Sequence, residues 1–579
     1  MTQTSSLEDA RRLPPAGFER KAFYGLAALV LVMKALAILH YRVDSDETQH
    51  AHIVWGWATG QLPYRDLFDN HMELFQMLCA PLFRLLGETP YIIPELRVAI
   101  LPIFGLCLWA VYSLAETLFS RRIAPWAALA AAAMPLFFYT STEFRPDDLW
   151  AAFWLLALAV AARGRFTVGR AAAFGLMVGL AAAVSLKTVV LVAALLTATI
   201  IAMAYALARG WRTGIMGSGV RLLVILAVGV IPPAALVFYF WRQGALPIMR
   251  YCVIDHNMVP GLKRWGHFSL HFWDFPLGVA CMAAYAGLIF HQTRDTGLAI
   301  RRTFVLLTPF LYLALLLSYW PDLTREDNLP DTPLLPLALA PVFILLDSLV
   351  RSAERRRRFL SYGLPALCFA ELLWTWNANP LRNDRVKGTT EGLRDVLRLT
   401  HPGEMVMDAK GDYIFRPRPY YWVIETVTRA RIRMGLIRDR LQDKLVQYSP
   451  RVCYLYAAHL LPDASLFVVS NYMPFDPLAL DVGVLGKVLP NPAPDGTFSF
   501  EVAIPGRYAV VSESGDTQGT LDGTPYSGPV ELNAGHHTFH RTGGSGRAAI
   551  FLDRAAAAGF HPLFNQSLKM IAAEHARNK

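Results

Sequence analysis

The sequence is poor in charged residues. Only 17% of its 579 residues are Asp, Glu, Lys or Arg, whereas soluble domains carry about a quarter. Hydrophobic residues make up 54%, and the mean hydropathy is +0.33. This scarcity of charge excludes an ordinary soluble protein and predicts a polytopic membrane protein with a smaller polar part.

Cysteine is also scarce, and acidic residues are in the minority. The six cysteines form no CxxC pair and no regular spacing, which argues against a cysteine-based zinc cage or a disulfide scaffold. Basic residues outnumber acidic ones by 55 to 45, giving a net charge of +10. Because the basic residues fall in short loops between apolar runs, we attribute the charge to membrane topology and expect no nucleic-acid partner.

Long apolar runs dominate the first two thirds of the chain. Eleven are of spanning length, at 22–40, 95–119, 123–140, 148–162, 171–186, 188–208, 220–243, 275–291, 304–320, 332–350 and 359–377. A shorter run, 73–86, is expected to lie in the interface or to re-enter. The N-terminus lacks an A-x-A cleavage signal, and the first run is expected to remain as a signal anchor. Basic clusters recur in alternate loops, so the positive-inside rule predicts an extracytoplasmic location for everything after residue 377.

The composition becomes that of a soluble protein near residue 380. Between 381 and 490, helical patterns at 390–399 and 430–445 alternate with apolar strands at 405–407, 451–455 and 465–469, which indicates an α/β domain. From 491 to 579, short alternating strands between glycine-rich turns predict a β-sandwich. We therefore expect three domains: 1–380, 381–490 and 491–579.

The densest group of ionisable side chains follows the first apolar run, between residues 44 and 73. Charge at a membrane boundary is costly unless it is paired or functional, so this segment is the first candidate for an active site. The adjacent carboxylates of Asp46 and Glu47 can supply a general base; alternatively, they belong to an ordinary polar loop. Asp69 and His71 can ligate a divalent metal ion, or they form a solvated turn.

Two further candidate sites lie on loops that the topology assigns to the outer face. Arg145 and Asp147 can orient a substrate through charge-assisted hydrogen bonds, or the acid can cap the helix that follows. Lys187 stands alone among apolar residues. It can bind a phosphate, or it can extend its ammonium group to the surface.

The loop around residues 251–264 combines basic and aromatic residues. His256, Lys263 and Arg264 suit a lipid-linked phosphate and its sugar. The alternative is that this loop anchors the protein in the membrane interface. The polar loop at 324–330 contains no residue that its chemistry singles out.

Together these residues resemble the GT-C glycosyltransferases, closest to the protein O-mannosyltransferases and the transferase that puts aminoarabinose on lipid A. Asp46-Glu47-Thr48 is similar to the Asp-Glu pair of the family's first outer loop, and Asp69 to the acid that follows it. The family's Lys-Pro is absent here, and His71 stands near the lysine position. The other similar segments are Arg97, Arg145-Pro146-Asp147, Ser185-Leu186-Lys187-Thr188 and Asp255-His256-Asn257.

The resemblance implies an α-helical polytopic GT-C fold of about eleven spans plus an interfacial helix, followed by the α/β and β-sandwich regions. It implies inverting transfer of a sugar from a polyprenyl-phosphate donor to a hydroxyl acceptor on a lipid, glycan or protein. In this interpretation Asp46 is the base and Glu47 supports it. The remaining roles are substrate orientation by Asp69, His71, Arg145 and Asp147, and binding of the donor phosphate by Lys187, His256, Lys263 and Arg264. A divalent metal ion at Asp69 and His71 is left open.

We expect a multi-pass protein of the bacterial inner membrane, in contact with membrane lipid, with its C-terminal region in the periplasm. Three alternatives remain open. A transporter would carry more charge at mid-span. A non-catalytic envelope carbohydrate-binding or assembly protein would act through the C-terminal region alone. A lipid-linked oligosaccharide ligase or polymerase would rely on Arg and His more than on paired acids.

Overall fold

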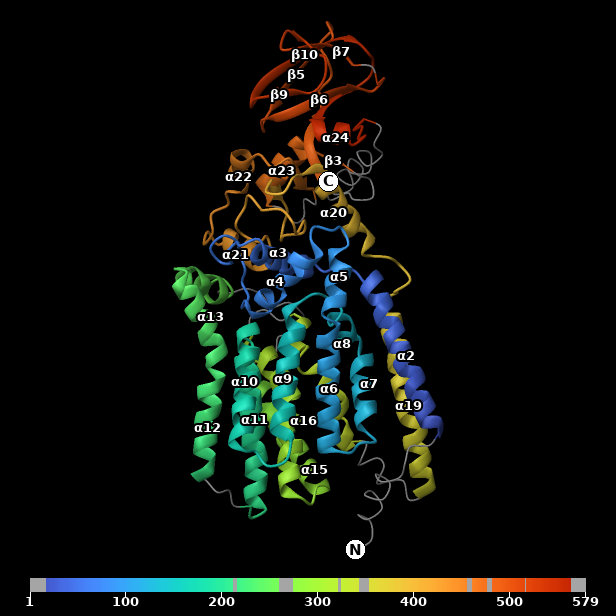
Figure 1. The fold of residues 1–579 in the computed structure, drawn as a ribbon, viewed down its shortest axis with the longest axis vertical. Coiled ribbons are helices and arrows are strands. Elements are labelled where there is room, and N and C mark those ends of the chain that lie inside the picture. The colour runs from blue at the N-terminus through green and yellow to red at the C-terminus, as the bar shows by residue number, and fades with distance from the viewer. Residues whose placement is uncertain are drawn as a thin grey trace. The chain divides into compact units, whose positions relative to one another are not determined.

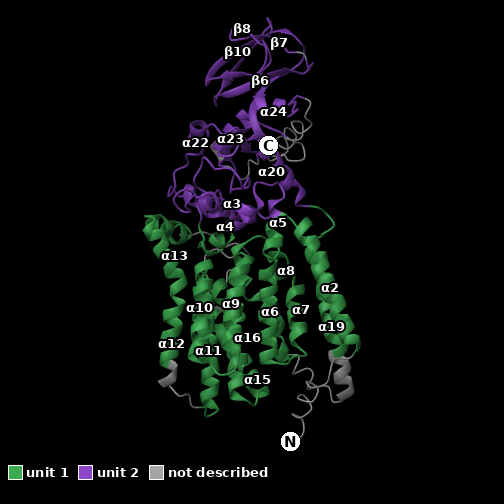
Figure 2. Ribbon diagram, in the orientation of Figure 1, with its two compact units in different colours: residues 1–42, 70–79, 94–384 green, residues 43–69, 80–93, 385–579 purple. Residues whose placement is uncertain are grey.

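The computed structural model describes residues 17–211, 216–259, 274–320, 324–342, 353–455, 461–475, 482–515 and 517–563. The chain divides into two compact units (Figure 2). The first contains residues 1–42, 70–79 and 94–384, and the second contains residues 43–69, 80–93 and 385–579. The second unit therefore includes the early segment that carries Asp46, together with the C-terminal region.

The first unit is a set of apolar helices (Figure 1). Among the described residues, six helical stretches are long and apolar enough to cross a membrane. These are Gly17–His40 (α2), Ile92–Leu118 (α5 and α6), Thr188–Ala208 (α11), Gly219–Arg242 (α12 and α13), Phe275–Gln292 (α15) and Thr296–Tyr319 (α16). Shorter apolar helices lie at Leu74–Leu86 (α4), Ala124–Ala133 (α7), Val168–Val184 (α10) and Thr332–Val342. The chain is a multi-pass membrane protein, and the predicted helical fold is confirmed.

The helix boundaries follow most of the predicted runs, several of which are interrupted, and proline explains the interruption at 123–140. The run at 123–140 is divided into α7, which ends at Ala133, and α8 (Pro135–Thr140). Met134 adopts an extended conformation, with ψ of 125°. A residue before proline is driven out of the helical region by the proline ring, and proline lacks the N–H that would continue the helix. A helix α9 (Pro146–Ala162) follows.

Two glycines allow α10 and α12 (Met216–Gly229) to pack closely within the first unit. A Cβ atom at Gly175 would lie 2.5 Å from the carbonyl oxygen of Ile225, and one at Gly179 would lie closer still to that of Gly229. Small residues four apart let helix backbones approach when lipid supplies no hydrophobic drive for association. Gly179 therefore has a packing role in this fold.

The second unit contains two sheets. The larger has the order β1-β2-β4-β11-β6-β9, with β3 pairing to β4, and the smaller has the order β5-β10-β7-β8. The larger sheet contains β1 (Val406–Met407), β2 (Val452–Tyr454), β3 (Tyr472–Pro474), β4 (Val482–Val488), β6 (Gly506–Ser512), β9 (Val530–Leu532) and β11 (Ala548–Leu552). The smaller contains β5 (Thr497–Val502), β7 (Gln518–Leu521), β8 (Thr524–Pro525) and β10 (Gly535–Gly543). Because β4 pairs with β11, one sheet crosses the predicted boundary at residue 490, and the three-domain division stays a prediction.

Helices of the second unit pack beside these sheets. They include α20 (Lys387–Leu399), α21 (Thr426–Arg433), α22 (Leu441–Tyr448), α23 (Pro462–Asn471) and α24 (Asp553–Ala557). The predicted strand at 465–469 is wrong, because α23 occupies it. A short apolar run does not distinguish a strand from a buried helix, and Pro462 at the first helical turn favours the helix. The predicted helix at 430–445 is interrupted after α21, where Gly435 has a φ of 71°.

Candidate active site

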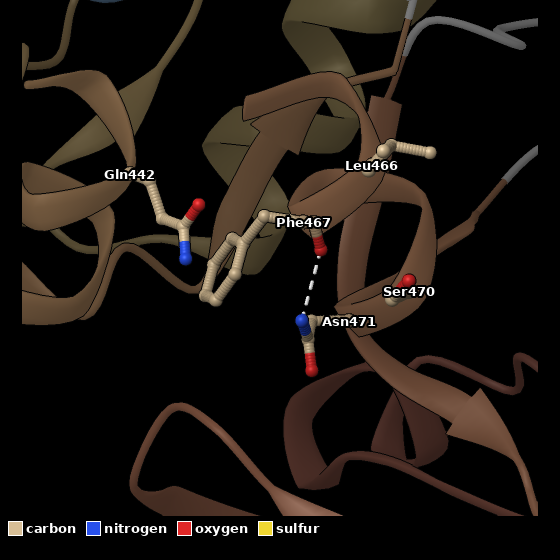
Figure 3. Close-up of a pocket in the computed structure, with 5 residues that line it drawn as sticks. All are labelled: Gln442, Leu466, Phe467, Ser470 and Asn471. Carbon is tan, nitrogen blue, oxygen red and sulfur yellow. Dashed lines mark hydrogen bonds between the residues drawn. The ribbon is translucent and has the colours of Figure 1, made fainter. Parts of the chain in front are cut away.

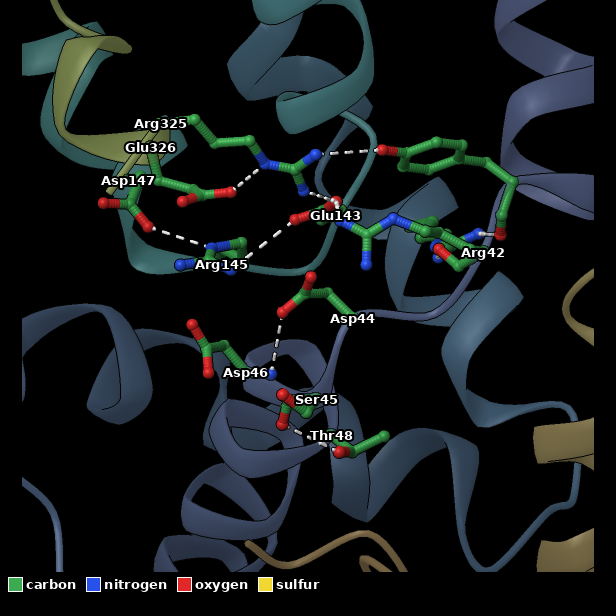
Figure 4. Close-up of polar contacts among 12 residues, drawn as sticks. Arg42, Asp44, Ser45, Asp46, Thr48, Glu143, Arg145, Asp147, Arg325 and Glu326 are labelled. Atoms are coloured by element: carbon green, nitrogen blue, oxygen red, sulfur yellow. Dashed lines mark hydrogen bonds and ion pairs between the residues drawn. The ribbon is translucent and has the colours of Figure 1, made fainter. Parts of the chain in front are cut away.

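The segment that follows the first span begins a helix with an acidic first turn. In α3 (Ser45–Ala58), the Asp44 side chain caps the helix by accepting a hydrogen bond of 3.1 Å from the backbone N–H of Asp46 (Figure 4). Carboxylates are stabilised near a helix N-terminus by the free N–H groups and the helix dipole. The side chain of Asp46 is one-third exposed, whereas Glu47 is completely buried. Of the predicted pair, Asp46 is therefore the carboxylate with the more open position.

A lysine from the C-terminal part of the chain pairs with Asp46. Lys410 Nζ lies 2.5 Å from Asp46 Oδ1, and both residues belong to the second unit. Burial lowers the pKa of Lys410, but the carboxylates of Asp46 and Glu425 oppose burial more strongly, so that its pKa is raised overall. Lys410 consequently remains an ammonium ion next to the proposed base. Lys410 is not among the site residues expected from the sequence.

In the first unit, one buried carboxylate lies within 4.0 Å of three guanidinium groups. Glu143 has no exposed surface. Its Oε1 lies 2.8 Å from Arg325 and 4.0 Å from Arg42, and its Oε2 lies 3.6 Å from Arg145 (Figure 4). Arg325 also pairs with Glu326. We call Arg42, Glu143, Arg145 and Arg325 the arginine cluster.

The predicted pair of Arg145 and Asp147 is close in space. Arg145 Nε lies 3.2 Å from Asp147 Oδ2. The alternative that an acid caps the helix is wrong, since Arg145 occupies the N-cap position of α9 and makes no side-chain capping hydrogen bond. Asp147 lies in the first turn of α9, where the helix dipole stabilises its negative charge. It is therefore available to orient the guanidinium of Arg145.

Lys187 stands immediately before α11 and forms an ion pair with Asp327. Asp327 is completely buried and also accepts a hydrogen bond of 2.9 Å from the backbone N–H of Thr324. Burial raises the pKa of Asp327, the ammonium of Lys187 opposes that effect, and the carboxylate of Asp147 reinforces it. The loop at 324–330, in which the sequence singled out no residue, therefore supplies Asp327 as the partner of Lys187 and Glu326 as a partner of Arg325. The only sign of this pair in the sequence was the isolated position of Lys187 among apolar residues, because a lysine there usually has an acidic partner.

Three cations of this unit are more accessible than the buried acids with which they pair. The side chains of Arg42, Arg325 and Lys187 are 37%, 39% and 27% exposed. Those of Glu143 and Asp327 have no exposure. Positive groups placed above buried carboxylates can accept a further anion from outside, and arginine forks match phosphate oxygens well.

A fully buried arginine fixes the end of the first span. Arg97 Nη1 donates to the carbonyl oxygens of Ala37, Ile38 and Tyr41, at 3.4, 3.2 and 2.9 Å, and Nη2 donates to that of Arg42 at 2.9 Å. The last carbonyls of a helix have no partner within it, so this guanidinium satisfies the C-terminal end of α2. Arg97 thereby orients Arg42, a member of the arginine cluster.

The remaining predicted site residues are divided among different environments. Asn70 Nδ2 donates to Asn257 Oδ1, and Asn257 Nδ2 donates to the backbone carbonyl oxygen of Asn70, each at 3.0 Å. These bonds join the segments that carry His71 and His256 within the first unit. His256 is buried, and Asp69 is buried in the second unit. Lys263 and Arg264 lie outside the described residues. Over the described ranges, no three His, Cys, Asp or Glu side chains are arranged to hold a metal ion, so the possible metal at Asp69 and His71 gains no support.

The second unit contains an open pocket. It measures about 420 Å³ and lies between α22 and α23, lined by Gln442, Leu466, Phe467, Ser470 and Asn471 (Figure 3). The Asn471 amide is turned back onto the carbonyl oxygen of Phe467 at 2.9 Å. None of the predicted site residues lines this pocket.

Comparison with known proteins agrees with the fold. The profile of the family described as dolichyl-phosphate-mannose-protein mannosyltransferase matches residues 93–237. The crystal structure of ArnT from Cupriavidus metallidurans bound to undecaprenyl phosphate matches with a TM-score of 0.50 at 15% identity, over 79% of this chain and 97% of that one. The same protein in the apo state matches with a TM-score of 0.50 at 14% identity, over 79% of this chain and 96% of that one.

A third structure is more distant. Archaeal oligosaccharyltransferase AglB from Archaeoglobus fulgidus, in complex with an inhibitory peptide and a dolichol-phosphate, has a TM-score of 0.41 at 11% identity, over 81% of this chain and 74% of that one. No curated protein sequence matches the chain. The likeness to ArnT shows that the chain has the GT-C fold expected from its sequence.

Proposed function

We propose that this protein is a membrane glycosyltransferase that moves a sugar from a polyprenyl-phosphate carrier to a hydroxyl acceptor. The observation that carries the proposal is the arrangement of charge in the first unit, where accessible cations stand over buried carboxylates. This arrangement suits the phosphate of a lipid-borne donor. The GT-C fold and the match to a mannosyltransferase family over residues 93–237 support it.

The carrier is proposed by analogy with the matched structure, which is described as bound to undecaprenyl phosphate. In this proposal the accessible Arg42, Arg325 and Lys187 stabilise the negative charge that grows on the phosphate as the bond to the sugar breaks. Exclusion of water near the lipid strengthens these contacts, because a low dielectric screens charge less. The acceptor is a lipid, a cell-envelope glycan or a protein.

Asp46 is the proposed base. Its carboxylate would take the proton of the acceptor hydroxyl while the hydroxyl oxygen attacks the anomeric carbon from the face opposite the phosphate. The configuration at that carbon is thereby inverted. We place the reaction at the outer face of a bacterial inner membrane, with the C-terminal region in the periplasm, as the distribution of basic loops indicates.

The test uses the purified full chain in lipid nanodiscs with a panel of undecaprenyl-phosphate-linked sugars. Release of undecaprenyl phosphate is measured in the presence of an envelope extract as acceptor. We expect release by the wild type, and at least a 100-fold lower rate for Asp46→Asn at unchanged thermal stability. The matched control is Asp443→Asn, which removes an exposed acid in the first turn of α22. Full activity of Asp46→Asn would overturn the assignment of the base.

Mass spectrometry of envelope glycans from a strain lacking the gene identifies the acceptor. We expect the loss of a single sugar modification, restored by the wild-type gene and not by the Asp46→Asn variant. Unchanged envelope glycans and glycoproteins, with no release of carrier phosphate in the nanodisc assay, would contradict the proposed function.

A further inference from the structure

The ion pair between Asp46 and Lys410 joins residues that are 364 positions apart in the chain. The Lys410 side chain is only 17% exposed. Ordering and burying a lysine costs conformational entropy and hydration, so a chain that does this must gain from the contact. The partner is the acid that the sequence pattern singles out as a base.

The loop that presents Lys410 is held by two aspartates. The carboxylate of Asp408 accepts hydrogen bonds from the backbone N–H groups of Gly411 and Tyr413, at 2.7 and 3.0 Å. The carboxylate of Asp412 accepts from those of Ala409 and Lys410, at 3.2 and 3.1 Å. Side-chain acceptors of this kind fix a turn in place of regular secondary structure. We call residues 408–418 the lysine loop.

An arginine secures the base of the lysine loop. Arg418 Nε lies 2.7 Å from Asp408 Oδ1, and its Nη2 donates to the carbonyl oxygens of Asp408, Ala409 and Trp422. Neither Arg418 nor Asp408 is substantially exposed. The backbone on either side of Lys410 is therefore fixed by buried, charged hydrogen bonds.

Helix α3 contacts the lysine loop through two side chains. Thr48 Oγ1 donates to Asp412 Oδ1 at 3.3 Å, and His52 Nδ1 lies 2.8 Å from the carbonyl oxygen of Ile414. Gly411 has a φ of 101°, and a Cβ atom there would lie 2.6 Å from His52 Cβ. These contacts place the first turn of α3 directly beside Lys410.

Other charged groups of the second unit face this pair. Asp44 caps α3 by accepting a hydrogen bond from the backbone N–H of Asp46, and Glu47 follows Asp46 in the sequence. Asp412 accepts a hydrogen bond from Thr48, the residue after Glu47. The carboxylate of Glu425 raises the pKa of Lys410, and Arg418 pairs with Asp408 within the lysine loop. These acidic groups lie near the ion pair, and Lys410 supplies an opposite charge in direct contact with Asp46.

We propose that Lys410 is a positioning residue for Asp46, which holds one carboxylate oxygen in place and keeps the group ionised and ready to accept the proton of the acceptor hydroxyl. This inference rests on the proposed function. It makes the lysine loop, which belongs to the C-terminal region, a part of the catalytic apparatus. Without the ammonium, the surrounding acids would favour the protonated form of Asp46.

The experiment compares Lys410→Met and Lys410→Arg with the wild-type full chain in nanodiscs. The pH dependence of kcat/KM is measured with undecaprenyl-phosphate-linked sugar. We expect the acid limb of Lys410→Met to move up by about one pH unit or more, with the KM for the donor unchanged and with Lys410→Arg restoring the wild-type limb. The matched control is Lys387→Met, which removes an exposed lysine that pairs with Glu391 on α20.

A second readout does not depend on activity. Carbodiimide modifies protonated carboxyl groups, and tandem mass spectrometry reports the extent at Asp46 as a function of pH. We expect the midpoint to rise in Lys410→Met by the same amount as the acid limb, at unchanged thermal stability. A wild-type midpoint in Lys410→Met would overturn the inference, even if sugar transfer is observed. A raised midpoint in a protein that transfers no sugar would uphold the role of the ion pair and overturn the proposed function instead.

Discussion

Arg325 Nη2 donates to Glu143 Oε1 at 2.8 Å, across 182 positions of the sequence. Glu143 is completely buried and lies within 4.0 Å of Arg42 and 3.6 Å of Arg145. One carboxylate thus holds guanidinium groups from three separate segments. Glu143 is the acid that all three guanidinium groups share, and a shared opposite charge offsets their mutual repulsion. Arg145 and Arg325 also pair with Asp147 and Glu326.

Replacing Glu143 with glutamine keeps its shape and removes its charge. We expect Glu143→Gln to lower the free energy of unfolding by about 3 kcal/mol, because three cations lose a buried partner. The measurement is thermal unfolding in detergent, together with binding of undecaprenyl phosphate. The control is Glu116→Gln, which breaks an exposed pair with Arg121 and is expected to cost less than about 1 kcal/mol. Equal effects of the two substitutions would contradict the role assigned to Glu143.

Lys187 is the partner of Asp327 and, under the proposed function, a ligand for the donor phosphate, and the two roles can be separated. We expect Lys187→Met to lose stability, since Asp327 is left buried without its cation. The double variant Lys187→Met/Asp327→Asn removes both charges and should recover stability. Sugar transfer should remain at least about 100-fold below the wild type in both variants, because the phosphate contact is absent. Wild-type transfer by the double variant would exclude Lys187 from the phosphate site.

His52 makes the stability of the second unit sensitive to acid. Burial lowers the pKa of His52 from 6.5 to about 4, against the opposing effect of the Ile414 carbonyl. The unfolded chain therefore binds a proton between these values and the folded chain does not. Stability is fully present above pH 6.5 and falls as the pH drops toward 4, by up to about 3 kcal/mol.

The measurement is the unfolding temperature of the full chain between pH 7.5 and pH 4, against His52→Asn. Asparagine can still donate to the Ile414 carbonyl oxygen, but it does not titrate. We expect a flatter pH profile for the variant. Parallel profiles for the two proteins would show that His52 is not the group responsible.

Gly411 is required both by its backbone conformation and by its contact with His52. Gly411→Ala places a methyl group in a left-handed backbone and 2.6 Å from His52 Cβ. Gly403→Ala is the control, because Gly403 has a similar φ of 84° and nothing within 4 Å of an added Cβ. We expect about 1 kcal/mol of destabilisation at Gly403 and about 2 kcal/mol more at Gly411.

The same pair of variants tests whether the contact between α3 and the lysine loop positions Lys410 beside Asp46. Thermal unfolding gives the difference in stability, and the pH profile of kcat/KM shows whether Lys410 still reaches Asp46. We expect Gly411→Ala, unlike Gly403→Ala, to shift the acid limb in the direction of Lys410→Met. If Gly411→Ala matched Gly403→Ala in both measurements, α3 would not depend on this contact.

The sequence by itself determined the helical membrane fold, because apolar runs of spanning length and the prolines that interrupt them act locally. It also placed Asp46 directly after the first span and Arg145 near Asp147, since these residues are neighbours in the chain, whereas the helix that begins at Ser45 came from the structure. Where a local pattern was ambiguous, as at 465–469, packing chose α23 over the predicted strand.

Only the tertiary structure decided which charges meet. The pairs of Asp46 with Lys410, of Lys187 with Asp327 and of Glu143 with Arg325 join residues 364, 140 and 182 positions apart. A polar loop such as 324–330 gives no local sign of the partner it will find. Apolar periodicity reports the environment of each segment, whereas an ion pair depends on where two distant segments are brought together.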